Sequence, residues 1–289
     1  DGIFVLHHCP EISDVDHMLE LLQTAGCRVR REGHMVILDT RSLDNHRITG
    51  SGAGKMRSTI TLLGSMLGRL HQVEIPYPGG CTIGKRPIDL HLSGLRLLGA
   101  DFRQEEHTLC GSADRLHGAQ ICLHFPSVGA TENAMLAACA AEGETVIMNA
   151  AKEPEISELQ SFLQKLGADV TGAGSATVRV RGRGLEPFTV GHRIMPDRIV
   201  SSTLLCACAA AGGDIELRGV VPGHFSTVLH SLSECGCDIM SNSSCVRLRS
   251  GGNLRAPMPV ITGPYPGFPT DAQPLLLAAC LKAKGTSVF

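Results

Sequence analysis

The chain has no tryptophan and two tyrosines, and aromatic residues make up only 3% of its 289 positions. Because aromatics are so scarce, the core must be built from Leu, Ile, Val, Ala and Cys. An excess of one charge is missing too: 26 basic and 28 acidic side chains give a net charge of −2, without the basic excess of nucleic-acid-binding proteins. No run of 18 apolar residues occurs, which argues against a membrane-spanning helix. These absences favour a globular enzyme or binding domain.

The cysteines lack the spacing of a structural metal site. Most of the twelve lie in apolar stretches such as Leu204-Leu205-Cys206-Ala207-Cys208-Ala209, where a thiol packs like a small hydrophobic side chain. Cys206-x-Cys208 and Cys235-x-Cys237 are too closely spaced for a zinc ribbon, and His7-His8-Cys9 has no second ligand cluster. Asp1-Gly2-Ile3 does not resemble a secretory signal. We therefore expect a cytoplasmic protein with reduced thiols, no metal and no other cofactor.

Two glycine-marked patterns recur along the chain. In one, an Ala-rich helical pattern is followed by a glycine and a Val/Ile-rich strand pattern; the glycines, spaced about 70 residues apart, are Gly143, Gly213 and Gly285. In the other, a glycine follows a different predicted helix, with spacings of 73, 68 and 69 residues between Gly26, Gly99, Gly167 and Gly236. A fixed period indicates a repeated supersecondary unit. The glycine after each second helix is expected to end it in a left-handed conformation.

The repeat predicts a βαβαββ unit. The first helix of each unit is apolar nearly all round and should be buried, at 130–141, 200–211 and 272–283. The second helix has one apolar face, as at 157–166, and Ser13-x-x-Asp16 resembles a capping box that opens the matching helix at 14–25. The strands are expected at 145–149, 214–218, Met35–Asp39, 177–181 and 245–249. The predicted fold class is therefore α/β.

Both ends of the chain fall inside a repeat. Residues 2–6 align with the strand after Gly143, and 286–289 align with the same strand after Gly285. Because the sequence also lacks an initiator methionine, we interpret it as a fragment. We expect residues 1–195 to form a nearly complete first domain and residues 196–289 to form part of a second.

The segment from Tyr77 to Leu90 has the strongest chemical character. Pro78 and three glycines predict a loop, and Cys81 lies in it beside Lys85 and Arg86. Cations lower the pKa of a thiol and so favour a reactive thiolate or a tuned acid. The alternative is a loop thiol without a function.

Other loops carry candidate anion or proton-transfer groups. The segment from Pro126 to Thr131 leads into a buried helix, whose free N–H groups suit a phosphate, although capping by Ser127 or Thr131 is the simpler explanation. Asp271, in Phe268-Pro269-Thr270-Asp271, is either a helix cap or a catalytic base. The stretch from Ser51 to Arg57 does not match a phosphate-binding loop, but its basic side chains either meet an anion or lie on a solvated loop.

Five stretches together form a specific pattern: Pro78-Gly79-Gly80-Cys81-Thr82-Ile83-Gly84, Arg86-Pro87-Ile88-Asp89-Leu90-His91-Leu92, Ser127-Val128-Gly129-Ala130-Thr131-Glu132-Asn133, Glu153-Pro154-Glu155-Ile156 and Phe268-Pro269-Thr270-Asp271. With them the chain resembles, over essentially its whole length, the UDP-N-acetylglucosamine enolpyruvyl (1-carboxyvinyl) transferases. The resemblance implies a two-domain inside-out α/β barrel of six such units, with buried helices and outer sheets. Cys81 separates the chain from the sister 5-enolpyruvylshikimate-3-phosphate synthases, which lack a cysteine there.

The resemblance also implies an activity. The family transfers enolpyruvyl from phosphoenolpyruvate to the 3′-hydroxyl of UDP-N-acetylglucosamine and releases phosphate, in the first committed step of peptidoglycan synthesis, without a metal. Cys81 would protonate the C3 methylene and be the target of fosfomycin, Asp271 would accept the hydroxyl proton, and Arg86 would contact the phosphate of phosphoenolpyruvate. The substrate-binding residues would be Arg57, Arg86, Pro87, Ile88, Asp89, Leu90, Ser127, Val128, Gly129 and Asp271. No nucleic-acid or membrane partner is expected, and the protein would be a monomer or a weak homo-oligomer.

The chain departs from the family in several places. The family's Lys-Asn pair would precede Asp1 and its last catalytic Arg would follow Phe289, so we expect nucleotide binding with poor turnover. Phe125 stands where a lysine is common, and Val200-Ser201-Ser202-Thr203 replaces an acidic residue and Gly-Thr. The alternatives are a non-catalytic or truncated sugar-nucleotide-binding paralogue and another enolpyruvyl transferase related to the shikimate enzymes.

Overall fold

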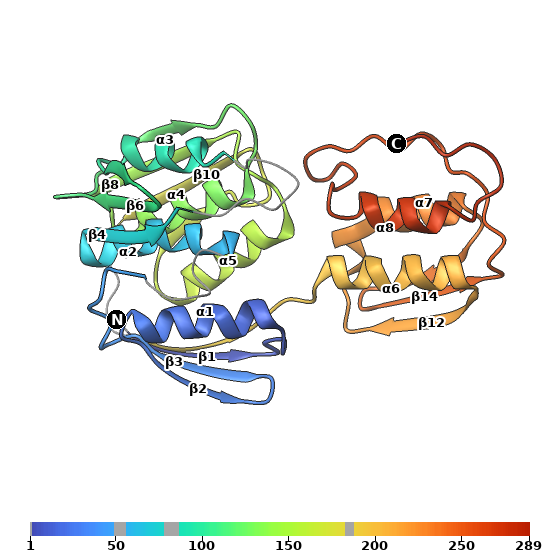
Figure 1. The fold of residues 1–289 in the computed structure, drawn as a ribbon, viewed down its shortest axis with the longest axis horizontal. Coiled ribbons are helices and arrows are strands. Elements are labelled where there is room, and N and C mark those ends of the chain that lie inside the picture. The colour runs from blue at the N-terminus through green and yellow to red at the C-terminus, as the bar shows by residue number, and fades with distance from the viewer. Residues whose placement is uncertain (1, 49–55, 78–86, 183–187) are drawn as a thin grey trace. The chain divides into compact units, whose positions relative to one another are not determined.

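The computed structural model describes residues 2–48, 56–77, 87–182 and 188–289. It divides the chain into two compact units, Asp1–Ile194 and Met195–Phe289, each of which is described by itself (Figure 1). In the described residues, no helix combines the length and apolarity that crossing a membrane requires.

The described residues of the first unit form three separate sheets. One has the order β11-β1-β3-β2, another β4-β6-β5, and the third β7-β8-β10-β9. Their strands are β1 (Gly2–His7), β2 (Arg28–Glu32), β3 (Met35–Asp39), β4 (Gln72–Pro76), β5 (Asp101–Glu105), β6 (Thr108–Ser112), β7 (Gln120–Cys122), β8 (Gly143–Met148), β9 (Asp169–Thr171), β10 (Thr177–Gly182) and β11 (Phe188–Arg193). Each sheet has an antiparallel core, to which β11 and β7 add a parallel edge in two of them.

The βαβαββ unit is confirmed between residues 120 and 182. There the chain runs through β7, α4 (Val128–Ala140), β8, α5 (Pro154–Lys165), β9 and β10. Strand β10 pairs with β8 from Thr177↔Met148 to Gly182↔Gly143, and its buried residues alternate with exposed ones. The sheet therefore turns one face to the helices and the other to solvent.

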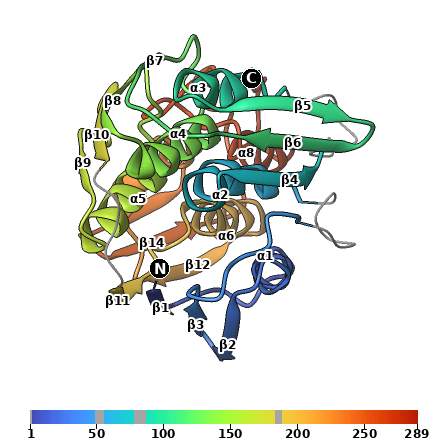
Figure 2. The same cartoon turned by 90° about the vertical axis from the view of Figure 1, so that its left-hand side faces the viewer.

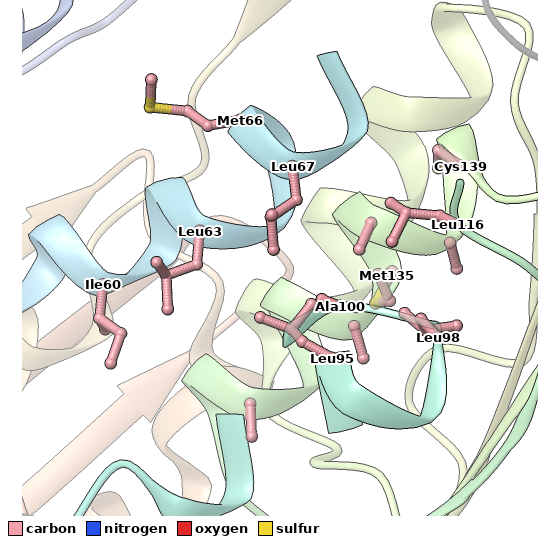
Figure 3. Close-up of a cluster of buried hydrophobic side chains, with 14 of the residues drawn as sticks. Ile60, Leu63, Met66, Leu67, Leu95, Leu98, Ala100, Leu116, Met135 and Cys139 are labelled. Carbon is pink, nitrogen blue, oxygen red and sulfur yellow. The ribbon is translucent and has the colours of Figure 1, made fainter. Parts of the chain in front are cut away.

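Helices fill the inside of this unit, as the sequence predicts. Helix α2 (Leu62–Leu70), which follows a 3₁₀ turn η1 (Arg57–Thr61), lies against α4, and α3 (Asp89–Leu97) packs on the other side of α4 (Figure 2). Figure 3 shows that α2 and α3 direct Leu63, Leu67 and Leu95 toward one cluster around Met135 of α4, while Met66 points away from it. Small residues surround Met135 on α4 because the helices approach closely.

The close approach of α2 and α4 depends on Gly64. A Cβ atom there would overlap the carbonyl oxygen of Asn133. We expect Gly64→Ala to lower the free energy of unfolding by about 2 kcal/mol or more, although alanine normally favours a helix over glycine by about 1 kcal/mol. Gly94→Ala in α3 is the control, since its Cβ would meet Ile121 Cγ2 at 3.6 Å, an ordinary contact, and should stabilise the protein. Chemical denaturation of both variants checks this, and equal effects would contradict it.

The predicted glycine ends of four helices are confirmed, whereas the predicted start of α1 is wrong. The glycines after the second helices, Gly26, Gly99, Gly167 and Gly236, all have φ between 87° and 102°, which confirms their left-handed role. The capping box is wrong: α1 (Ser13–Thr24) starts at Ser13 itself, its cap position is Ile12, and no side chain caps it. Asp16 instead pairs with Arg31, at 2.6 Å from its Nη1, so tertiary charge pairing replaces the local cap.

The second unit contains one three-stranded sheet with the order β12-β14-β13. Its elements are α6 (Arg198–Ala211), β12 (Gly213–Arg218), η2 (Pro222–Phe225), α7 (Ser226–Glu234), β13 (Asp238–Ser241), β14 (Cys245–Ser250) and α8 (Gln273–Cys280). Helices α6 and α8 lie side by side, and α6 also covers β14.

Three expectations fail in this unit. Helices α6 and α8 are not buried all round, since Val200 of α6 and Leu277 of α8 are 54% and 41% exposed. Helix α8 ends at Cys280 rather than 283, because the chain turns there to bridge Lys284 to Arg255. Residues 286–289 form no strand, although Val260 N donates to the oxygen of Val288. The matching strands β8 and β12 pair with β10 and β14, whereas 286–289 has no such ladder.

An apolar groove of about 580 Å³ adjoins the helices of the first unit. It is lined by the second half of α4, by α2 and by α5, with Leu136, Met66, Phe162 and Leu163 among its walls. Helix α2 is followed by β4 and helix α4 by β8. Each of these strands is the first in sequence of the antiparallel core of its sheet.

Candidate active site

The start of α3 holds four of the predicted substrate-binding residues. Arg57, in η1, donates from Nη2 to the carbonyl oxygen of Pro87 at 3.3 Å. Asp89 begins the helix and is exposed, while Leu90 is half-buried against the core. Ile88 is only 3% exposed and belongs to the core, so its side chain is not a ligand contact and only its backbone is left for that role.

The start of α4 holds the other predicted anion-binding segment. Ser127 is the cap residue, and its Oγ accepts from Ala130 N at 3.4 Å, so the capping alternative is confirmed for this serine. Thr131 does not cap the helix: its hydroxyl donates to the oxygen of Ser127 and accepts from Ala151 N. Val128 and Gly129 occupy the first turn, where backbone N–H groups have no partner within the helix.

The two helix starts touch through His91. A Cβ atom at Gly129 would lie 2.9 Å from His91 Cε1 and 3.3 Å from Nε2, so the imidazole edge lies on the first turn of α4. The charge of Arg57 acts on the same imidazole. The structure thus brings together Arg57, residues 87–90 and residues 127–129, from three separate parts of the sequence.

His91 and Asn133 are functional candidates that the sequence analysis missed. Both are buried, at 6% and 0% exposed, and Asn133 Nδ2 lies 2.8 Å from His91 Nδ1. Burial, reinforced by the nearby Arg57, lowers the pKa of His91 to about 4, against the opposing effect of Asp89. The imidazole is therefore neutral at physiological pH. The sequence did contain a signal: each is a polar residue within an apolar helix. Both also lie in the motifs 86–92 and 127–133, which were discussed for their other residues.

Glu132 lies one turn into α4. Burial and, to a smaller extent, the negative charge of Glu155 on α5 together raise the pKa of this carboxyl group to about 7. A carboxyl group with such a pKa exchanges its proton near neutral pH.

The folded pKa of Glu132 lies above its ordinary value of 4.5. Its stabilising contribution is complete below pH 4.5 and is lost as the pH rises toward 7. We expect Glu132→Gln to match the wild type at pH 4.5 and to exceed its free energy of unfolding by on the order of 2–3 kcal/mol at pH 8. Urea denaturation between these values checks this, with Glu20→Gln on the exposed face of α1 as the control. Parallel curves for Glu132→Gln and the wild type would refute it.

Cys81 and Arg86 lie outside the described residues, as does the basic loop at 49–55. By sequence, the segment that carries Cys81 and Arg86 joins Tyr77 to Pro87, and Pro87 is the residue that Arg57 contacts. Phe125, which precedes the start of α4, is 55% exposed.

Asp271 lies in the second unit, just before α8. The cap position of α8 is Ala272, and no side chain caps it, so the capping alternative for Asp271 is wrong. The carboxylate is exposed. In the related place before α6, Asp197 does cap the helix, accepting from Ile199 N and Val200 N at 2.7 and 3.0 Å.

No group of three or more potential ligands suited to a metal ion occurs in the part of the chain that the structure describes. The thiols there are free, and burial raises the pKa of several, to about 12 for Cys139 and Cys206. The apolar groove beside α4 is lined by none of the predicted site residues that have been placed. What the first unit offers at the start of α3 and α4 is an arginine, a neutral imidazole and backbone N–H groups, a set suited to phosphate oxygens.

Comparison with known proteins decides the family. Residues 2–289 match the family model described as EPSP synthase (3-phosphoshikimate 1-carboxyvinyltransferase). The chain belongs to the enolpyruvyl (carboxyvinyl) transferase family. It is 41% identical to UDP-N-acetylglucosamine 1-carboxyvinyltransferase 2 of Caldanaerobacter subterraneus, covering 100% of this chain and 69% of that protein. It is 42% identical to UDP-N-acetylglucosamine 1-carboxyvinyltransferase 1 of Carboxydothermus hydrogenoformans, covering 99% and 67%.

The enolpyruvyl transferase fold is confirmed by a solved structure. The crystal structure of the enolpyruvyl transferase NikO from Streptomyces tendae matches with a TM-score of 0.85 at 22% identity, over 99% of this chain and 68% of that one. At this identity the likeness shows the fold alone. The chain is an enolpyruvyl transferase by family and by fold, which makes it a transferase, and it spans about two thirds of the length of the relatives that it matches.

Proposed function

We propose that this enolpyruvyl transferase moves the enolpyruvyl group of phosphoenolpyruvate to the 3′-hydroxyl of UDP-N-acetylglucosamine, releasing phosphate for peptidoglycan synthesis. The observation that carries the proposal is the meeting of Arg57, residues 87–90 and residues 127–129 at the starts of α3 and α4. Two anionic substrates require cations and helix N-termini, and the site supplies both. The names of the relatives at 41–42% identity support the choice of sugar nucleotide.

The residues divide the chemistry among them. Residues 87–90 and 127–129 hold the uridine diphosphate, with Arg57 beside the sugar nucleotide. Cys81 donates a proton to the C3 methylene of phosphoenolpyruvate, while Asp271 takes the proton of the attacking hydroxyl. The hydroxyl oxygen bonds to C2 and gives a tetrahedral intermediate. Loss of a proton from C3 then re-forms the C2–C3 double bond as the C2–O bond to the phosphate breaks, with Arg86 beside the phosphate as it leaves. Most cysteines of the sequence lie in apolar stretches, as reduced core thiols do, and we infer that the reaction takes place in the cytoplasm.

A thermal-shift measurement tests the nucleotide site. We expect UDP-N-acetylglucosamine to raise the melting temperature of residues 1–289, because a ligand at one hundred times its Kd stabilises the folded state by about 2.7 kcal/mol. Shikimate 3-phosphate is the control, and we expect no shift with it. No shift with millimolar UDP-N-acetylglucosamine would refute a formed site, and a shift with shikimate 3-phosphate instead would favour a relative of the shikimate enzymes.

A further inference from the structure

The side-chain amide of Asn133 has a fixed orientation. Its Oδ1 accepts from the backbone N–H of Gly64 at 2.8 Å, and its Nδ2 donates to the carbonyl oxygen of Ile60 at 2.9 Å. A backbone N–H is only a donor and a carbonyl is only an acceptor, so both contacts select the same arrangement of oxygen and nitrogen. The amide cannot be flipped without breaking both bonds inside a fully buried site.

This orientation determines which nitrogen of His91 carries the proton. Asn133 Nδ2 has two hydrogens, and the one not used by Ile60 faces His91 Nδ1 at 2.8 Å. Nδ1 must therefore accept, which leaves the proton of the neutral imidazole on Nε2. Burial keeps the ring neutral, since it lowers the pKa of His91 to about 4.

The Nε2 edge of the ring faces the first turn of α4. A Cβ atom on Gly129 would lie 3.3 Å from Nε2 and 2.9 Å from Cε1, so this edge of the ring packs directly against the glycine. Within residues 2–48, 56–77, 87–182 and 188–289 no hydrogen-bond partner of Nε2 is found. His91 is only 6% exposed, yet Nε2 is not among the fully buried polar atoms that lack a partner, so this N–H remains reachable by a ligand.

We propose that Asn133 holds His91 as the Nε2–H tautomer, and that this N–H donates to a phosphate oxygen of the nucleotide diphosphate at the start of α4. Asn133 is then a positioning residue, and His91 contacts the ligand. This role rests on the proposed function for its ligand, but the tautomer does not. A neutral donor suits this place because its hydrogen bond does not depend on pH near neutrality.

Nitrogen NMR of protein labelled with ¹⁵N-histidine tests the tautomer without any ligand. The His91 signals are identified by their loss in His91→Gln. We expect an unprotonated Nδ1 and a protonated Nε2 in the wild type, and the opposite tautomer or an imidazolium in Asn133→Asp, whose carboxylate accepts from Nδ1–H. A protonated Nδ1 in the wild type would overturn the proposal, and the wild-type spectrum decides this whether or not Asn133→Asp folds.

Binding of UDP and of uridine tests the ligand. We expect His91→Phe, which lacks the donor, to weaken UDP binding about 10- to 100-fold and to leave uridine binding unchanged. His91→Gln, whose amide nitrogen can replace Nε2, should retain most of the affinity for UDP. Equal losses for UDP and uridine would overturn the phosphate contact. If the wild type shows the expected tautomer but binds neither UDP nor UDP-N-acetylglucosamine, the proposed function fails. The hydrogen bond by which Asn133 sets the tautomer of His91 would still stand.

Discussion

Cys81→Ala is expected to abolish covalent labelling of the protein by fosfomycin in the presence of UDP-N-acetylglucosamine. Labelling requires a thiolate, which attacks an epoxide carbon, opens the C–O bond and leaves an alkoxide that takes up a proton. Cys81 lies beside Lys85 and Arg86 in the sequence, and cations of this kind favour the thiolate. Mass spectrometry of the intact protein and of its peptides measures the adduct.

The other thiols are poor competitors for this reaction. Cys139 and Cys206 are buried, and burial raises the pKa of each to about 12, so almost none of either is ionised at neutral pH. Cys122 is the exposed thiol among those described, which makes Cys122→Ala the matched control. We expect full labelling of that variant. An adduct on Cys122, or labelling that survives Cys81→Ala, would show that Cys81 is not the reactive thiol.

Asp271→Asn is expected to reduce the rate of phosphate release about 10²- to 10⁴-fold, the usual contribution of a positioned acid or base. The carboxylate is exposed and does not cap α8, so its loss should leave the melting temperature unchanged. A steady-state phosphate assay and a thermal melt on the same preparation separate the two effects.

Asp197→Ala is the structural counterpart of this variant. Asp197 caps α6 with two hydrogen bonds, so its removal should cost about 1 kcal/mol of stability, measured by chemical denaturation. If Asp271→Asn instead lowers stability by a similar amount and keeps its activity, Asp271 has a structural role and the base lies elsewhere.

The repeat could be predicted because its determinants are local. Strand β3 was predicted with its exact bounds, Met35–Asp39, since alternation of buried and less buried side chains is written in consecutive residues. The glycines that end the second helices were predicted for a similar reason, because a left-handed residue has few alternatives to glycine. The family was predicted from five motifs whose combination is specific.

Contacts between distant residues were not predictable in this way. Asn133 joins Gly64 and His91, which lie 69 and 42 residues away. It stands out as a polar residue within an apolar helix, but the sequence does not indicate which distant residues it contacts. Ser13 was expected to cap α1, but the competing pair of Asp16 with Arg31 is tertiary. Ile88 was assigned to the ligand by its motif, whereas the packing of α3 places its side chain in the core.

The central claim is that the chain uses Cys81 to transfer enolpyruvyl to a sugar nucleotide. The most direct test is phosphate release by residues 1–289 from phosphoenolpyruvate, with UDP-N-acetylglucosamine or shikimate 3-phosphate as the acceptor, in the wild type and in Cys81→Ser. We predict release that requires UDP-N-acetylglucosamine and disappears in Cys81→Ser. Release with shikimate 3-phosphate alone, release that persists without the thiol, or no release by the wild type with either acceptor would contradict the claim.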